Sequence, residues 1–167
     1  MDGTRGSEPS PMKIRTTVER KSDRELLVTR TVNGPARLVF EAWTRPELFK
    51  QWWVPKSMGV SLFSCEMDVR VGGGYRLVFD HEGSPGMAFF GKYLEVIPNK
   101  KIVWTNEESG DQGAITTVTL DEKNGKTHLT MSELYPSKEA ADQAFEGMEG
   151  GMPETFEQLD AFLGSRS

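Results

Sequence analysis

The sequence predicts one α+β domain, in which a mainly antiparallel, curved sheet carries two short helices after its first strand and a long C-terminal helix across it. Three observations support this fold class. Short β-branched and aromatic runs follow one another, separated by turn residues. Three adjacent glycines, Gly72–Gly74, stand between two of these runs and favour a sharp reversal between paired strands. After Pro136, apolar residues recur at helical spacing.

The N-terminal part of the chain sets the first domain boundary. Residues 1–22 are rich in Gly, Ser, Pro and mixed charges and poor in large apolar groups, so we expect a disordered tail there. A single domain is expected over residues 23–164, and Arg24–Val32 is its first predicted strand. Pro35 then favours the start of a short helix, and Pro46 the start of another.

The middle of the chain changes to repeated strands. Asn124-Gly125 is the strongest of the tight-turn signals that separate them, and Gly83-Ser-Pro-Gly86 is another. The predicted strands cover Val60–Asp68, Tyr75–Phe79, Met87–Ile97, Lys101–Asn106, Ala114–Leu120 and Thr127–Leu134.

The C-terminal segment predicts an amphipathic helix that covers the sheet. Its apolar stripe is interrupted by Gly150, Gly151 and Pro153, which predicts either a kinked helix or a short helix followed by a longer one from near Pro153. The stripe consists of Phe145, Met148, Met152, Phe156, Leu159 and Leu163.

Composition excludes several classes of protein. No apolar run is long enough to cross a bilayer, and the N-terminus lacks a secretory core. Cys65 is the only cysteine, so we expect an inert strand residue and a cytoplasmic location. The stretch from Glu107 to Asp160 holds thirteen acidic residues against three lysines. Such an acidic segment repels phosphates, so nucleic acid is not an expected partner.

Motifs for metal binding or nucleophilic catalysis are missing from the sequence. His81 and His128 have no metal-ligand spacing with each other or with cysteine, so no metal or other cofactor is expected. No Gly-x-Ser-x-Gly nucleophile motif occurs, and the lone cysteine has no identifiable histidine partner. We therefore expect binding rather than catalysis.

Several motifs together resemble the START-like or Bet v 1-like superfamily, also called SRPBCC. Within it, the chain is similar to the branch named for the C-terminal domain of the heat-shock protein 90 ATPase activator homologue, a name that suggests a stress response. The matching segments are Pro35–Trp43, Pro46–Pro55, Asp68–Arg76, Gly91–Pro98 and Ile102–Thr105. The resemblance implies a helix-grip fold with a pocket between the C-terminal helix and the sheet. The family commonly has a Gly-Trp pair where this chain has Gly151-Met152, so ligand preference is not carried over.

Candidate ligand-binding residues come from the abundant aromatic and Met side chains, because Met adapts to irregular apolar ligands. Trp52 and Trp53 cannot both point inward from one short turn, so one of them is expected at a pocket rim or a protein contact. The predicted apolar lining is Trp52, Phe63, Tyr75, Met131, Met148, Met152 and Phe156, and the candidates for fixing a polar end are Arg76, Tyr93 and Glu133. Trp53, Phe79, Phe89 and Trp104 belong to the same aromatic set.

Glu133 is the one weak catalytic candidate. It shares a strand face with Leu129 and Met131, so a carboxylate there would face the pocket, where a cation such as Arg76 could pair with it. The alternative is that Glu133 lies in solvent at the end of its strand.

Three functions follow as hypotheses. The first is binding of a small, largely apolar or aromatic molecule. The second is a co-chaperone-like interaction module that acts on heat-shock protein 90. The third is a cyclase-like or hydrolase-like enzyme that uses Glu133. For assembly, we expect a monomer or a weak dimer, since an exposed strand edge could pair but no residue pattern requires it.

Overall fold

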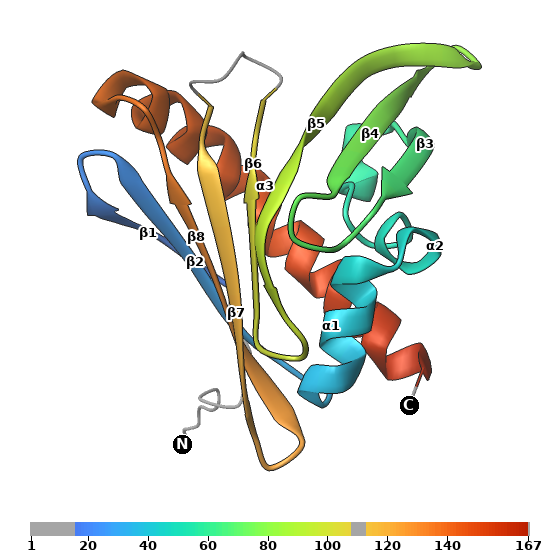
Figure 1. Ribbon diagram of the computed structural model, residues 1–167, viewed down its shortest axis with the longest axis vertical. Helices are drawn as coiled ribbons and strands as arrows, with labels where there is room; N and C mark the ends of the chain where they lie inside the picture. Colours follow the sequence, from blue (N-terminus) through green and yellow to red (C-terminus); the bar gives the residue numbers. More distant parts are fainter. Residues whose placement is uncertain (1–15, 108–112, 167) are drawn as a thin grey trace, which may run out of the picture.

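A computed structural model describes residues 16–107 and 113–166 and confirms the predicted α+β fold (Figure 1). The strands are β1 Thr17–Ser22, β2 Glu25–Val32, β3 Leu62–Met67, β4 Gly74–His81, β5 Ser84–Ile97, β6 Lys101–Thr105, β7 Ile115–Lys123 and β8 Lys126–Leu134. The helices are α1 Ala36–Thr44, α2 Pro46–Phe49 and α3 Lys138–Arg166, with a 3₁₀ turn, η2, at Lys56–Met58.

The strands form one sheet in the order β1-β2-β8-β7-β6-β5-β4-β3. Every neighbouring pair is antiparallel, as predicted. The first two strands of the chain therefore lie beside the last one, and the middle of the chain forms the other half of the sheet. This division decides where a cavity can form.

The predicted tail was too long. Residues 17–22 form strand β1, which pairs with β2 at the edge of the sheet. Most side chains of this edge strand are exposed, so the strand can be polar. It therefore lacks the apolar residues on which the prediction relied. Backbone pairing with β2 supplies the order instead, and Arg20 of β1 also donates to Asp142 of α3 over 2.5 Å. The rest of the predicted tail, residues 1–15, lies outside the described residues.

Two predicted reversals are confirmed by backbone geometry. Gly72 has φ +86° in the turn between β3 and β4, a conformation that glycine adopts without a Cβ clash. Asn124 and Gly125 have φ +54° and +79° between β7 and β8. Two successive positive φ angles are typical of the hairpin turn that an Asn-Gly pair favours.

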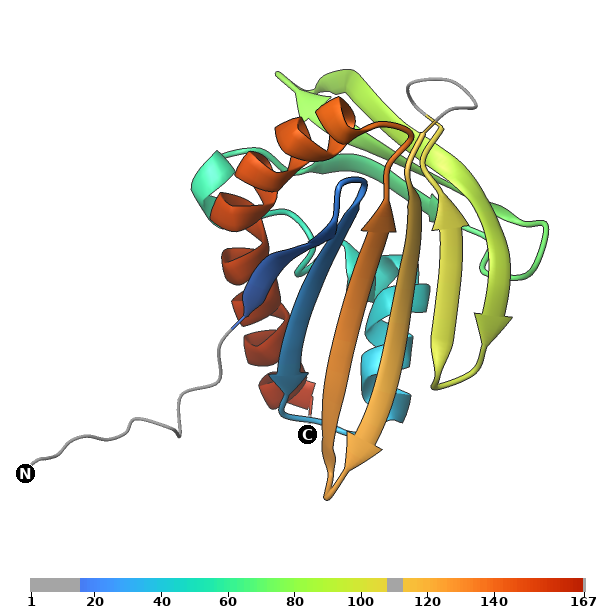
Figure 2. The same ribbon diagram turned by 90° about the vertical axis from the view of Figure 1, so that its left-hand side faces the viewer.

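Helix α3 is continuous over 29 residues and contains Pro153 in its interior, so of the two predicted arrangements the single helix holds. It starts after Ser137, whose hydroxyl accepts a hydrogen bond from the Ala140 N–H over 3.1 Å and so caps the helix. The helix contacts β1 and β2, while α1 contacts β7 and β8. Figure 2 shows α3 bending past the sheet, with both helices on the same side.

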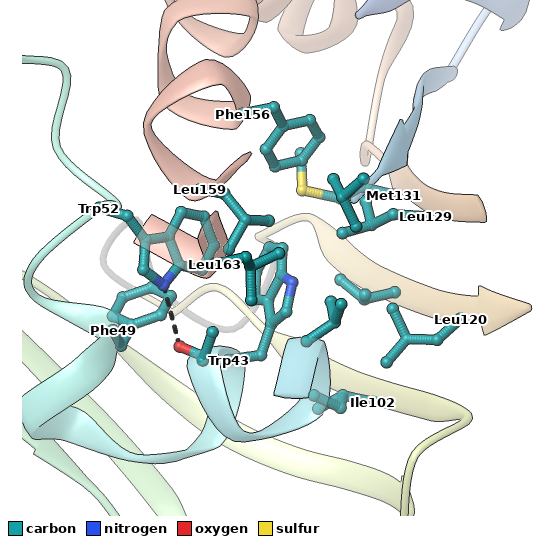
Figure 3. Packing of buried hydrophobic residues seen from close by; sticks show 14 of the residues in the cluster. Trp43, Phe49, Trp52, Ile102, Leu120, Leu129, Met131, Phe156, Leu159 and Leu163 are labelled. Atoms are coloured by element: carbon teal, nitrogen blue, oxygen red, sulfur yellow. Dashed lines mark hydrogen bonds between the residues drawn. The ribbon is translucent and has the colours of Figure 1, made fainter. Parts of the chain in front are cut away.

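The main core lies where α1 and the C-terminal half of α3 meet β2, β7 and β8 (Figure 3). Trp52 is fully buried there, and its indole N–H donates to the Ala42 carbonyl over 3.0 Å. Ala42 is in the last turn of α1, where carbonyls have no partner within the helix. Trp52 therefore satisfies one of them, in addition to filling the core.

Candidate functional site

A cavity of about 540 Å³ lies between α3 and the half of the sheet made by β3, β4, β5 and β6. This volume is in the range of small-molecule sites in proteins. The described residues that line it are Trp43, Phe49, Trp53, Val54, Pro55, Met58, Met67, Tyr75, Leu77, Phe79, Phe89, Tyr93, Trp104, Asn106, Gln143, Ala144, Gly147, Met148, Gly151, Met152 and Thr155.

The lining is neutral and mostly apolar. Aromatic rings and four methionines, Met58, Met67, Met148 and Met152, make up much of it, and none of the lining residues that the structure describes carries a formal charge. Burying an ion without a counter-charge or several hydrogen bonds costs on the order of several kcal/mol. The cavity is therefore suited to a neutral occupant.

Strand alternation explains how the sheet side of the lining forms. Tyr75, Leu77 and Phe79 are every second residue of β4 and point to the same face. On β5, Phe89 and Tyr93 do the same, with Gly91 between them. A Cβ at Gly91 would lie 1.9 Å from the Thr105 carbonyl oxygen, so glycine is required there for β5 and β6 to approach each other.

A chain of hydrogen bonds leads from the cavity wall into the sheet. The Tyr75 hydroxyl is 3.2 Å from Asn106 Oδ1, and Asn106 Nδ2 donates to Thr116 Oγ1 over 2.9 Å. The Thr116 hydroxyl donates to Glu133 Oε2 over 2.9 Å, and Glu133 Oε1 accepts from the Tyr135 hydroxyl. Of the five residues in this hydrogen-bond network, only Tyr75 and Asn106 line the cavity. Theirs are therefore the polar atoms of the network that are placed to contact an occupant.

The titration of three groups near the cavity is shifted toward the neutral form. Burial raises the pKa of Tyr93 well above its ordinary value, and the neighbouring Cys65 and Asp68 raise it further. Burial also raises the pKa of Tyr135, as does the Glu133 carboxylate. Burial raises the pKa of the Cys65 thiol to about 11. These groups stay protonated at neutral pH, which keeps this region uncharged and makes the Cys65 thiol a poor nucleophile.

Helix α3 also holds the loop that forms one side of the cavity. Gln158 Nε2 donates to the carbonyls of Trp52 and Val54, each over 2.9 Å. Glu154 Oε2 accepts from the Ser57 N–H over 2.9 Å, and its other oxygen accepts from the Ser57 hydroxyl over 2.5 Å. These bonds lower the pKa of Glu154 below its ordinary value. They fix the loop on the same helix that covers the cavity.

The structure brings four of the ten predicted ligand-binding residues to the cavity, namely Tyr75, Tyr93, Met148 and Met152. Tyr75 and Tyr93 lie with their ring centroids 5.8 Å apart on the sheet side, whereas the two methionines come from α3. Of the two neighbouring tryptophans, Trp53 lines the cavity and Trp52 is buried behind it. The ligand-binding role of the four residues remains a prediction.

Three predicted lining residues lie in the core instead, which corrects their placement. Trp52, Met131 and Phe156 have at most 1% of their surface exposed and lie outside the lining. Met131 is paired across the sheet with Val28 and Val118, in the half that α3 and α1 cover directly. Their inward direction was predicted correctly, but other side chains fill the space in front of them (Figure 3).

Phe63, Arg76 and Glu133 also lie outside the lining. Phe63 is 46% exposed at an irregularity in the pairing of β3 with β4. Arg76 alternates with the cavity-facing residues of β4, so it faces away, and its guanidinium lies 5.8 Å from the centre of the Phe90 ring. Glu133 instead accepts hydrogen bonds from Thr116 and Tyr135 and is half-buried near the end of β8.

The sequence did not lead us to predict that Asn106, Gly147 or Gly151 would line the cavity. Asn106 lies one residue past the end of β6, although the predicted strand included it and alternation placed it on the same face as Trp104. Gly147 and Gly151 were detectable as members of an i, i+4 series with Gln143 and Thr155 on one side of α3. Gly151 was interpreted as a helix interruption, whereas in the folded chain it leaves open space at the cavity wall.

Within residues 16–107 and 113–166, no group of three or more His, Cys, Asp or Glu side chains could hold a metal ion. Over the same residues, no helix is long and apolar enough to span a bilayer.

Comparison with known proteins places the chain among relatives of this fold. The sequence profile of the family described as "Activator of Hsp90 ATPase homolog 1-like protein" matches residues 33–164. No curated protein matches the chain.

Solved structures match nearly the whole chain. A protein from Nitrosomonas europaea has a TM-score of 0.78 and 27% identity, over 88% of this chain and 98% of that one. A protein from Staphylococcus epidermidis has a TM-score of 0.75 and 27% identity, over 90% and 95%. A Rhodobacter sphaeroides protein, with a TM-score of 0.81, 22% identity and coverage of 91% and 99%, shows the same fold.

Proposed function

This chain belongs to the activator of Hsp90 ATPase homolog 1-like family, which has the SRPBCC or Bet v 1-like fold, and we propose that it binds a neutral, largely apolar small molecule in the cavity under α3. The observation that carries the proposal is the cavity of about 540 Å³ whose described lining has aromatic and Met side chains but no charge. A cytoplasmic location is part of the proposal.

The energetics favour such an occupant. Each Å² of apolar surface removed from water contributes about 25 cal/mol, and the aromatic walls offer that surface on several sides. Tyr75 and Asn106 supply acceptor oxygens at one place in the wall, which can orient a single hydroxyl group, because the Tyr75 O–H donates to the Thr105 carbonyl and the Asn106 amide donates to Ala114 and Thr116. A carboxylate or sulfonate would find no cation among the described lining residues.

Two dyes with a shared frame test the proposal. N-phenyl-1-naphthylamine is neutral, and 8-anilino-1-naphthalenesulfonate is the same frame with a sulfonate. We expect saturable binding of the neutral dye at one site per chain, measured by fluorescence titration, and at least about ten-fold weaker binding of the sulfonate. Equal affinity for both dyes, or no saturable binding of the neutral dye, would contradict the proposal.

Two Met variants locate the binding. Met152→Ala removes a side chain from the cavity wall. The loss in free energy of binding of the neutral dye should exceed the loss in free energy of unfolding. Met87→Ala is the matched control, because Met87 is 68% exposed on β5 and lies outside the lining. Native mass spectrometry of the freshly purified chain then identifies any compound that it retains.

A co-chaperone function is the second proposal, and the family description is the observation that favours it. Binding to purified heat-shock protein 90 that weakens steeply with salt would support it, because charged surfaces would then carry the contact. Absence of binding at low salt would remove it.

The enzymatic alternative depends on Glu133, which hydrogen bonds to Thr116 and Tyr135 behind the cavity wall. If the chain turns over a substrate through this carboxylate, Glu133→Gln abolishes turnover while the fold persists. Unchanged turnover would remove the assignment.

A further inference from the structure

Tyr93 of β5 is the one tyrosine whose hydroxyl group has no hydrogen-bond partner in the part of the chain that the structure describes. It lines the cavity, and only 4% of its surface is exposed. The Tyr75 hydroxyl, in contrast, donates to the Thr105 carbonyl over 2.8 Å, and the Tyr135 hydroxyl donates to Glu133. A buried hydroxyl group without a partner is costly, because it gives up its hydrogen bonds to water and gains none in return.

The Tyr93 oxygen is open to the cavity. Within residues 16–107 and 113–166, the Trp43 indole nitrogen is the only fully enclosed side-chain nitrogen or oxygen that lacks a partner. The Tyr93 oxygen lacks a partner as well, so it is not fully enclosed. Because Tyr93 is in the cavity lining and nearly all of its surface is covered by protein, the remaining free surface of its oxygen faces the cavity. An occupant can therefore reach this hydroxyl group.

The glycine turn between β3 and β4 holds Tyr93 in place. The Tyr93 carbonyl accepts from the Gly72 N–H, and the Tyr93 N–H donates to the Gly73 carbonyl, each over 2.9 Å. A Cβ at Gly73 would lie 2.1 Å from the Asp68 carbonyl oxygen, so glycine is required in this turn. The rings of Tyr75 and Tyr93 have their centroids 5.8 Å apart. Backbone and ring are therefore both held, which leaves the hydroxyl group little freedom to find a partner elsewhere in the chain.

The Tyr93 hydroxyl group is suited to donate a hydrogen bond to a neutral acceptor. Burial, with Cys65 and Asp68 nearby, raises the pKa of Tyr93 well above its ordinary value, so the hydroxyl group keeps its proton at neutral pH. A carbonyl oxygen is a neutral acceptor with two lone pairs. A carboxylate would also accept the proton, but none of the described lining residues carries a charge to pair with it.

We propose that Tyr93 determines ligand specificity, and that the occupant of the cavity is a neutral ring compound whose carbonyl oxygen accepts a hydrogen bond from the Tyr93 hydroxyl group. The aromatic walls contact the ring of this compound. A hydroxyl group elsewhere on the same compound can contact the acceptor oxygens of Tyr75 and Asn106. This inference rests on the proposed function of the cavity and names the chemical class of its ligand.

Two neutral compounds of nearly the same shape test the contact. 2-Acetylnaphthalene has a carbonyl oxygen, and 2-isopropenylnaphthalene has a methylene group in its place. Their affinities are measured by displacement of N-phenyl-1-naphthylamine, which has no carbonyl group. In Tyr93→Phe we expect the affinity for the ketone to fall about ten-fold and the affinity for the alkene to stay the same or rise. Each compound is compared between the parent and the variant, so its own hydration cancels. Equal changes for the two compounds, or no change for either, would overturn the inference.

Stability separates this result from damage to the fold. Tyr93→Phe removes a hydroxyl group that has no partner in the described chain, so the urea midpoint should stay the same or rise. Tyr135→Phe is the matched control, because the Tyr135 hydroxyl is bonded to Glu133 and lies outside the lining. We expect its urea midpoint to fall, while the ratio of the two affinities stays that of the parent. A change of this ratio as large as in Tyr93→Phe would count against a specific role of Tyr93 and overturn the inference.

Infrared spectroscopy of the bound ketone measures the hydrogen bond directly, because a carbonyl group that accepts a hydrogen bond absorbs at lower frequency. The difference between spectra with unlabelled and carbon-13-labelled 2-acetylnaphthalene isolates the carbonyl band. We expect a lower carbonyl frequency in the parent chain than in Tyr93→Phe. The same frequency in both would show that the hydroxyl group does not reach the ligand, and would overturn the inference.

The two proposals can fail separately. If the dye binds the parent chain but Tyr93→Phe does not distinguish the ketone from the alkene, the specificity inference is wrong and the binding function stands. The same holds if the dye binds and the ketone does not displace it. If the dye does not bind the parent chain, the binding function fails and the inference with it.

Discussion

The ion pair between Arg30 of β2 and Asp160 of α3 fixes the C-terminal half of the helix on the sheet. Its side chains are 7% and 16% exposed, and the shortest contact is 2.8 Å. Asp160 Oδ2 accepts from two nitrogens of Arg30, and Oδ1 accepts from the Asn33 N–H over 2.8 Å. Arg30 also donates to the Thr16 hydroxyl over 3.0 Å. The Asp160 carboxylate thus accepts hydrogen bonds from three donor groups in a largely buried site.

Asp160→Ala would leave the Arg30 charge buried without its carboxylate. Removing one partner of a buried ion pair costs about 3–5 kcal/mol, a large part of the stability of a domain of this size. With a urea slope of about 2 kcal/mol per M, the midpoint should fall by about 1.5–2.5 M. The assay is urea unfolding followed by tryptophan fluorescence and by circular dichroism, which should report the same transition.

Asp142→Ala is the control for burial. Asp142 is also on α3 and also binds an arginine of the sheet, Arg20, but the two side chains are 44% and 30% exposed. Because water screens such a pair, the urea midpoint of Asp142→Ala should fall by less than about a third of the shift in Asp160→Ala. Equal shifts for the two variants would refute the reasoning, since burial would then not decide the cost. The double variant Arg30→Met/Asp160→Leu should recover much of the loss, because no charge remains buried.

Three further predictions concern Trp52, Cys65 and Glu154. Trp52→Phe removes the donor to the Ala42 carbonyl and leaves space in the core, so the free energy of unfolding in urea should fall by about 2–4 kcal/mol; a loss below about 1 kcal/mol would contradict this role. The Cys65 thiol, with its pKa of about 11, should react with iodoacetamide at pH 8 about 100-fold more slowly in the folded chain than in urea, and equal rates would show that it is not protected. The bonds from Ser57 lower the pKa of folded Glu154 below its unfolded value, so the stability that its carboxylate contributes is present above the unfolded pKa and is lost as the pH falls through the folded pKa. The difference in urea midpoint between the parent and Glu154→Gln should therefore be present at pH 7 and close in acid, whereas a difference independent of pH would rule out this titration.

The order of strands and helices was predictable because it depends on local signals. Alternation marks strands, Asn124-Gly125 requires a tight turn, and the helical stripe after Pro136 marks α3. Strand β1 was missed because its order comes from pairing with β2, to which its own polar residues give no clue. Pairing of distant segments is a tertiary property and leaves no local signal in an edge strand.

The site was predictable only in part. Alternation correctly gave the inward direction of both Met131 and Tyr75, yet Met131 is in the core and Tyr75 lines the cavity. Glu133 was expected at the cavity, but Thr116 and Tyr135 take up its carboxylate behind the wall. Thr116 comes from another strand and was not identifiable from spacing along the chain, whereas Tyr135 is two residues after Glu133 and follows the same alternation.

The sequence by itself determined which face of each strand points inward, since side-chain direction alternates with a fixed period of two. The tertiary structure decided what lies in front of that face. Over β2, β7 and β8 the space is filled by α1 and by the half of α3 that carries Phe156 and Leu159. Over the rest of the sheet the same helix presents Gly147 and Gly151, which have no side chain to fill the space, so a cavity remains there.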